Sequence, residues 1–337
     1  MPRPLAQRRV YGAPKPLPTM RLITAHDLRG SESAGKQAIL VSTKLLPSSE
    51  GRHRSARFHA PLPIRFWHLA SLDAPTVAVV WSVAFAWAAN VRLPWWVLIL
   101  LPLGVWAVYV ADRLLDARTG IQSPTLDALR ERHIFHWRNR RILAPMATAS
   151  ALAAAWIIFH RMPRTTQEHD SLLAAASLLY FTRVHSGRRF LSILSKEFLV
   201  GVLFTFGCAL FAFSRTHFSA ESQWWPVLVT TILFALLAWF NCYAIDHWES
   251  RNANPSHSSV TVHAMLLTAA FSISSALLAM SHPRSASLLA CGAAAALLLV
   301  ALDRVRSRLT PVTLRAAADL ALLTPAVLFA LWPLFRK

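Results

Sequence analysis

The run LLACGAAAALLLVAL, at Leu288–Leu302, is apolar throughout and shows no alternation of polar and apolar residues. A strand of a membrane β-barrel alternates in polarity over about ten residues. A helix, in contrast, satisfies all of its own backbone hydrogen bonds within lipid. The run is therefore typical of a membrane-spanning helix, and its small residues favour close packing against neighbouring helices.

Stretches of this kind recur from residue 74 onward. Hydrophobic residues make up 55% of the 337-residue chain and charged residues 15%, against about 25% charged in an ordinary soluble domain. We therefore predict an all-α polytopic membrane bundle of nine helices over residues 64–337. The nine predicted spans are Ala74–Val91, Trp95–Leu115, Ile142–Phe159, Leu172–Val184, Phe198–Phe213, Trp225–Ile245, Val262–Met280, Ala286–Leu302 and Ala316–Phe335.

Residues 1–60 differ from the rest of the chain in being basic and rich in Pro, Ser and Gly. They show no apolar periodicity and lack the apolar core of a secretory signal. We expect a disordered basic tail. A transit peptide, or a start of translation at Met20, would explain the same composition.

The formal net charge of +19 predicts how the protein is oriented. With nine spans and a cytoplasmic N-terminus, 28 of the 35 Lys and Arg residues fall in cytoplasmic segments. This bias follows the positive-inside rule. We expect an inner- or plasma-membrane protein that contacts membrane lipid, with its C-terminus on the opposite side. The high apolar content argues against a nucleic-acid-binding protein, and three widely spaced cysteines argue against a disulfide framework or a cysteine zinc site.

Two pairs of carboxylates lie at the predicted cytoplasmic ends of the second and sixth spans. Asp112 and Asp116 are four residues apart, and Asp246 and Glu249 are three apart, so each pair shares one helical face. Carboxylates next to lipid are costly and are candidates for function. Because Mg²⁺ binds one or two carboxylates together with water and phosphate oxygens, the pairs are candidate metal ligands.

A structural interpretation of these acids remains open. Carboxylates at a helix end can be solvated and paired with nearby Arg113, Arg118 or Arg251. For Asp303 and Asp319, which flank a basic loop, we expect such local ion pairing.

The helix count and the position of these acids resemble the UbiA superfamily of intramembrane prenyltransferases. VYVADRLLD, at Val108–Asp116, is similar to the second half of that family's first motif, N-D-x-x-D-R-x-x-D, and Arg118-Thr119 is similar to the Arg-Thr that follows it. LSKEFLVGVLFTFG, at Leu194–Gly207, looks like the family's fifth helix, and NCYAIDHWES, at Asn241–Ser250, lies where its second acidic motif belongs. Tyr180 resembles a tyrosine that usually ends the fourth helix.

The resemblance implies an isoprenoid diphosphate as substrate, Mg²⁺ as cofactor and an aromatic or lipid acceptor. It assigns metal binding to the four paired carboxylates, and catalysis to Asp112, Asp116, Asp246 and Lys196. The residues that it implies for substrate binding are Arg113, Arg118, Tyr180, Arg183, Asn241 and Tyr243.

The chain departs from the family pattern at several positions. Val108-Tyr109 replaces the opening Asn-Asp, Tyr243 replaces one Asp of the second motif, and Ser250 stands at its last acidic position, with Glu249 one residue earlier. Fewer carboxylates predict weaker binding of divalent ions. The alternative to a divergent transferase is a non-catalytic lipid-binding or scaffold protein of the same fold. A small-solute transporter has only the helix count in its favour.

The segment ERHIFHWRNRR, at Glu131–Arg141, contains His133 and His136 at a spacing that also occurs in iron sites. An iron site of that type would need several such histidine pairs. We expect instead a basic amphipathic segment on anionic lipid headgroups, anchored by Phe135 and Trp137.

Overall fold

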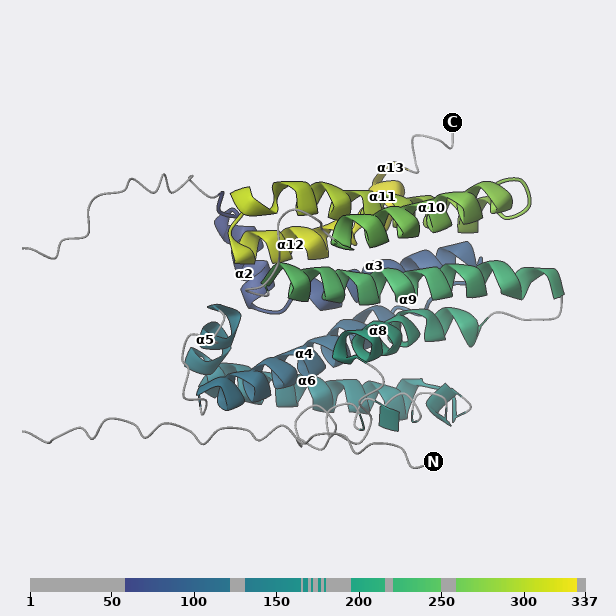
Figure 1. The fold of residues 1–337 in the computed structure, drawn as a ribbon. Helices are drawn as coiled ribbons and strands as arrows, with labels where there is room; N and C mark the ends of the chain where they lie inside the picture. The colour runs from purple at the N-terminus through teal and green to yellow at the C-terminus, as the bar shows by residue number, and fades with distance from the viewer. Residues whose placement is uncertain are drawn as a thin grey trace, which may run out of the picture. The chain divides into compact units, whose positions relative to one another are not determined.

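The computed structural model describes residues 58–121, 131–164, 195–215, 221–249 and 259–331, together with single residues between 166 and 179. All of these belong to one compact unit, Ser55–Lys337. The named elements among them are helices (Figure 1), as the apolar runs predict. They are α2 (Leu62–Leu69), α3 (Asp73–Ala88), α4 (Val97–Ile121), α5 (Glu131–Arg138), α6 (Arg140–Arg161), α8 (Lys196–Phe213), α9 (Glu221–Glu249), α10 (Ser259–Leu278), α11 (Pro283–Val305), the short 3₁₀ helix η2 (Arg306–Arg308), α12 (Pro311–Ala321) and α13 (Thr324–Leu331).

Six of these helices, α4, α6, α8, α9, α10 and α11, are long and apolar enough to cross a membrane. Two bent pairs raise the number of candidate spans to eight if each pair is one span: α2 with α3, bent by 87°, and α12 with α13, bent by 48°. These elements coincide with eight of the nine predicted stretches. The predicted span Leu172–Val184 falls mostly outside the described residues.

Helix starts follow local capping rules. Ser195 caps α8 by accepting a hydrogen bond from the backbone N–H of Phe198, and Thr310 caps α12 through the N–H of Thr313. Proline occupies the first turn of α2, α11 and α12, where its missing N–H costs nothing. Because Ser195 is the N-cap residue, Lys196 is the first residue of α8.

The core is built around α3. The rings of Trp81 and Phe234 stack with their centroids 3.9 Å apart, and both side chains are fully buried. The indole N–H of Trp81 donates to the carbonyl oxygen of Leu322 at 2.8 Å, which ties α3 to the end of α12. Elsewhere α10 packs along α11, α6 along α4, and α9 along α8.

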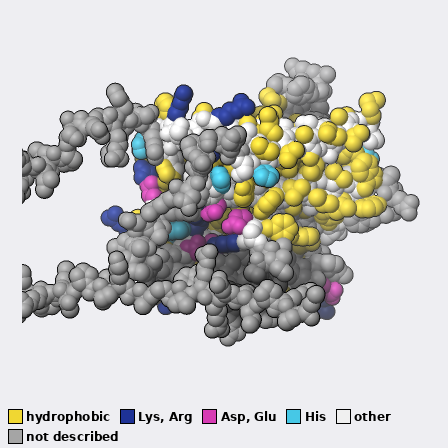
Figure 2. Space-filling view, in the orientation of Figure 1, with side chains coloured by type: hydrophobic (Ala, Val, Ile, Leu, Met, Phe, Trp, Pro, Cys, Tyr) yellow, Lys and Arg dark blue, Asp and Glu magenta, His cyan; other side chains and the backbone are white. Residues whose placement is uncertain are grey.

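The outer surface of the helices is apolar over much of its area. Figure 2 shows a broad field of hydrophobic side chains, with charged and histidine side chains gathered toward one end of the bundle. Leu152, Phe159 and Leu277 are each at least two-thirds exposed. Large apolar surfaces of this kind are typical of helices that face lipid. The length, composition and surface of the helices together indicate an integral membrane protein.

Candidate functional site

The first carboxylate pair lies beside the predicted lysine. α4 extends to Ile121, so Asp112 and Asp116 lie on its last turns and not beyond its end. Nζ of Lys196 is 3.9 Å from Oδ1 of Asp112 and 3.8 Å from Oδ2 of Asp116. All three side chains are partly exposed, with Lys196 the most open at 40%. The carboxylates of Asp112 and Asp116 and the ammonium group of Lys196, from distant parts of the sequence, therefore lie together at a partly exposed site.

The two members of the second carboxylate pair, Asp246 and Glu249, have different surroundings. The two oxygens of Glu249 accept hydrogen bonds from Arg315 of α12 at 3.0 and 3.3 Å. Asp246, three residues earlier on α9, has an exposed side chain. The hydroxyl of Tyr243 lies 3.1 Å from the Ser259 hydroxyl at the start of α10. Much of the second motif thus makes contacts that hold α9 to α10 and α12.

The remaining predicted binding residues are placed as follows. Arg113 is buried, with its guanidinium 5.9 Å from the centre of the Tyr109 ring. Arg118 is exposed on the last turn of α4. Asn241 is buried and donates through Nδ2 to Oδ1 of Asp319 at 3.1 Å. Tyr180 and Arg183 lie outside the described residues.

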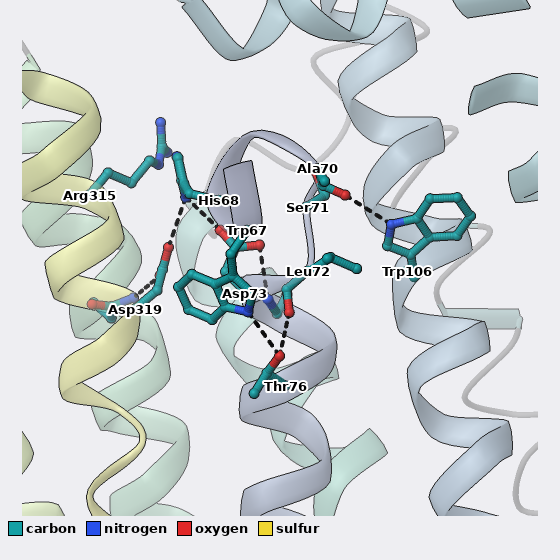
Figure 3. A network of polar contacts seen from close by, with 12 residues as sticks. Trp67, His68, Ala70, Ser71, Leu72, Asp73, Thr76, Trp106, Arg315 and Asp319 are labelled. Carbon is teal, nitrogen blue, oxygen red and sulfur yellow. Dashed lines mark hydrogen bonds and ion pairs between the residues drawn. The ribbon is translucent and has the colours of Figure 1, made fainter. Parts of the chain in front are cut away.

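A buried cluster that the sequence analysis did not identify lies where α2 turns into α3. His68 Nδ1 donates to Oδ2 of Asp73 at 2.7 Å and lies 3.5 Å from Oδ2 of Asp319 (Figure 3). His68, Asp73 and Asp319 therefore form a group of three potential metal ligands, with ligand atoms within 4.8 Å of one another. It is the one group of this kind among the described residues. The four predicted magnesium ligands do not form such a group in the part of the chain that the structure describes.

The expectation for Asp319 was therefore wrong, because its described contacts are with His68 and Asn241. The expectation for Asp303 is confirmed: its carboxylate pairs with Arg306 at 2.7 Å. Ionisable residues inside or beside apolar stretches are candidates for function. This rule could have drawn attention to His68, Asp73 and Asp319. The sequence pattern could not show that they meet, because the meeting depends on the 87° bend after α2.

The histidine-containing segment forms α5 and buries Arg132 and His136, and its predicted contact with lipid headgroups stays a prediction. His136 is fully buried, because α5 packs against α2, α4 and α6. Its Nδ1 donates to the carbonyl oxygen of Arg132 at 2.8 Å, so Nε2 accepts from the Ser71 hydroxyl at 3.2 Å. Burial, together with the positive charge of Arg113, lowers the pKa of His136 to about 4. Neutral His136 therefore stabilises, through Ser71, the turn between α2 and α3 next to the buried cluster.

Taken together, the polar end of the bundle holds two separate groups that could bind a cation. One is accessible and contains Asp112, Asp116 and Lys196, and the other is buried around His68. No model of a known protein family, no curated protein and no solved structure matches the chain, so the function of these groups is argued from the chain's own residues.

Proposed function

We propose that this protein transfers an isoprenoid group from its diphosphate to an acceptor within the membrane, with the diphosphate held at Asp112, Asp116 and Lys196. The observation that carries the proposal is the approach of Lys196 to both carboxylates, at 3.9 and 3.8 Å, from a helix far along the chain. Asp112 and Asp116 are the part of the first acidic motif that the chain contains. Lys196, which the resemblance implies binds the diphosphate, lies beside both of them.

The two aspartates fit the ligand preference of Mg²⁺, which binds one or two carboxylate oxygens and completes its shell with water and phosphate oxygens. Bound there, Mg²⁺ would neutralise the diphosphate and make it a better leaving group. Lys196 would donate to phosphate oxygens as a compact cation. The apolar helices would keep water from the allylic cation that ionisation produces.

The alternative is a protein that binds an isoprenoid diphosphate lipid without reacting with it. It is favoured by the contacts of the second motif, where Glu249 is held by Arg315 and Asn241 by Asp319. A single pair of aspartates would then hold the diphosphate through Mg²⁺, without the second carboxylate pair that the resemblance implies for catalysis. In either case we infer a cytoplasmic N-terminus from the distribution of basic residues.

Purified full-length protein with Mg²⁺ and allylic diphosphates of several chain lengths would test the proposal. The measurements are binding of each diphosphate and release of inorganic diphosphate with an aromatic acceptor present. We expect both in the natural protein, and loss of both in Asp112→Asn. Glu168→Gln changes an exposed carboxylate outside this group and serves as the control. Binding without release would support the alternative, and the absence of binding at every chain length would overturn both.

A further inference from the structure

The buried cluster around His68 contains more hydrogen-bond acceptors than donors. One oxygen of each carboxylate is satisfied: Oδ1 of Asp73 accepts from the backbone N–H of Ala74 at 2.9 Å, and Oδ1 of Asp319 accepts from Asn241. The two remaining oxygens, both Oδ2, converge on the single Nδ1 of His68. One N–H cannot fully satisfy two carboxylate oxygens that are largely shielded from solvent, so the cluster favours an additional positive charge.

A second acceptor lies at the same place. Asn241 is 96% buried, since its relative exposure is 4%, and its amide points into the cluster because Nδ2 donates to Asp319. Within the described part of the chain, its Oδ1 is buried without a hydrogen-bond partner. A buried carbonyl oxygen without a donor is costly. A cation bound next to Asp319 would satisfy it.

Asp303 shows what a purely structural buried carboxylate looks like in this protein. Its Oδ1 accepts from the Trp248 indole at 2.8 Å and from Arg306 at 2.7 Å, and its Oδ2 accepts from the Thr261 hydroxyl at 2.6 Å. Donors from three elements surround that carboxylate. Around Asp319 the neighbours include a second carboxylate and an amide oxygen, which are ligands for a cation.

We propose that His68, Asp73 and Asp319, assisted by the side-chain oxygen of Asn241, form a buried site for one divalent ion of the Zn²⁺ or Mn²⁺ class. An imidazole nitrogen suits Zn²⁺, and carboxylate and carbonyl oxygens suit Mn²⁺. The three ligand atoms already lie within 4.8 Å of one another. To bind the ion, Nδ1 of His68 gives up the proton that it donates to Asp73, and the neutral ring keeps its proton on Nε2. The ion reaches the site past Asp319, whose side chain is 17% exposed, whereas that of His68 is 2% exposed.

The site would join elements that are distant in sequence. His68 lies in the last turn of α2, Asp73 begins α3 and Asp319 comes from α12 (Figure 3). Asn241 comes from α9. An ion there would fix the 87° bend between α2 and α3 against α12. The inference goes beyond the proposed transfer reaction and does not depend on it, because Asp112 and Asp116 are not ligands of the buried site.

The test uses the full-length protein in detergent, loaded with Zn²⁺ or Mn²⁺ and washed. We expect one bound ion per chain by elemental analysis. For bound Mn²⁺ we also expect ¹⁴N coupling in pulsed electron paramagnetic resonance, which reports an imidazole ligand in the natural protein. Affinity should fall at least about tenfold in His68→Gln and Asp319→Asn. His160→Gln changes an exposed histidine on α6 and should leave binding unchanged.

The outcomes separate the two cation-binding groups. Loss of the ion in Asp319→Asn but not in Asp112→Asn supports the buried site. Loss in Asp112→Asn alone places the ion at the diphosphate group and overturns the inference. An ion without ¹⁴N coupling, or natural protein that retains no ion, also overturns it and leaves a shared proton as the extra positive charge.

Discussion

Gly201 of α8 lies directly against the backbone of Trp239 in α9. A Cβ atom placed on Gly201 would lie 2.6 Å from the backbone nitrogen and 2.7 Å from the Cα of Trp239. Backbone atoms cannot move aside as the end of a flexible side chain can, so the two helices approach closely only because residue 201 has no side chain. Since Lys196 begins the same helix, this contact also positions the lysine beside Asp112 and Asp116.

We therefore expect Gly201→Ala to push α8 away from α9. The cost should be about 1–3 kcal/mol, as for overpacking of a close contact, and diphosphate binding at Lys196 should weaken. The measurements are thermal unfolding in detergent and diphosphate affinity. Gly207→Ala is the matched control on the same helix, because no atom lies within 4 Å of its added Cβ. Equal melting temperatures for the two variants would contradict the close contact.

Lys196 should have opposite effects on the binding of metal and of diphosphate. Replacing it with Met removes the cation that lies within 4 Å of both aspartates. Mg²⁺ alone should bind at least as well, because the competing ammonium group is gone. Affinity for an isoprenoid diphosphate should fall about tenfold with the loss of one charge-assisted hydrogen bond.

Binding of Mg²⁺ and of diphosphate can be measured separately by titration calorimetry. Lys196→Arg keeps the positive charge and should retain most of the diphosphate affinity. A parallel loss of both affinities in Lys196→Met would show that the lysine supports the fold of the site and does not bind the phosphate.

Much of the fold follows from local sequence. Runs such as Leu288–Leu302 predict helices because length and apolar composition act within one segment. The bends are harder to predict: the last predicted span is broken into α12 and α13, and α2 turns through 87° into α3 at Ser71, where the backbone φ is 57°. Nothing in the apolar pattern indicates these breaks.

The same limit applies to the candidate site. Asp112 and Asp116 share a face because they are four apart on one helix, which the sequence shows directly. The contact of Asp73 with Asp319 through His68 depends on the packing of α12 against α2 and α3. The pairing of Glu249 with Arg315 depends likewise on packing between α9 and α12. Charge and hydropathy along the chain do not specify such partners.

Acid should destabilise the protein through His136. In the unfolded chain this histidine has its ordinary pKa of 6.5, whereas in the folded protein burial and Arg113 lower its pKa to about 4. Between these values the unfolded state binds more protons, so stability rises with pH and is lost as the pH falls from 6.5 toward 4. Protonation would also remove the acceptor for the Ser71 hydroxyl.

Melting temperatures at pH 5 and pH 7.5 test this expectation. The decrease at pH 5 should be smaller in His136→Gln than in the natural protein. It should be unchanged in His160→Gln, which alters an exposed histidine. If His136→Gln keeps the full decrease, other groups control the response to acid.

The ion pair between Glu249 and Arg315 offers a last test of whether Glu249 can serve as a metal ligand. Both side chains are 14% exposed, and Arg315 contacts both carboxylate oxygens, so the pair is shielded from solvent and well oriented. In a double-mutant cycle with Glu249→Gln and Arg315→Gln we expect a coupling free energy of about 1–3 kcal/mol. Arg315→Gln should be the more harmful single change, because it leaves the shielded Glu249 carboxylate without its described cation. If Glu249 is available to Mg²⁺, the ion should offset part of that loss, and added Mg²⁺ should raise the melting temperature of Arg315→Gln more than that of the double variant. Equal responses to Mg²⁺ would assign Glu249 to the packing of α9 against α12 and leave Asp112 and Asp116 as the ligands of the diphosphate-bound metal.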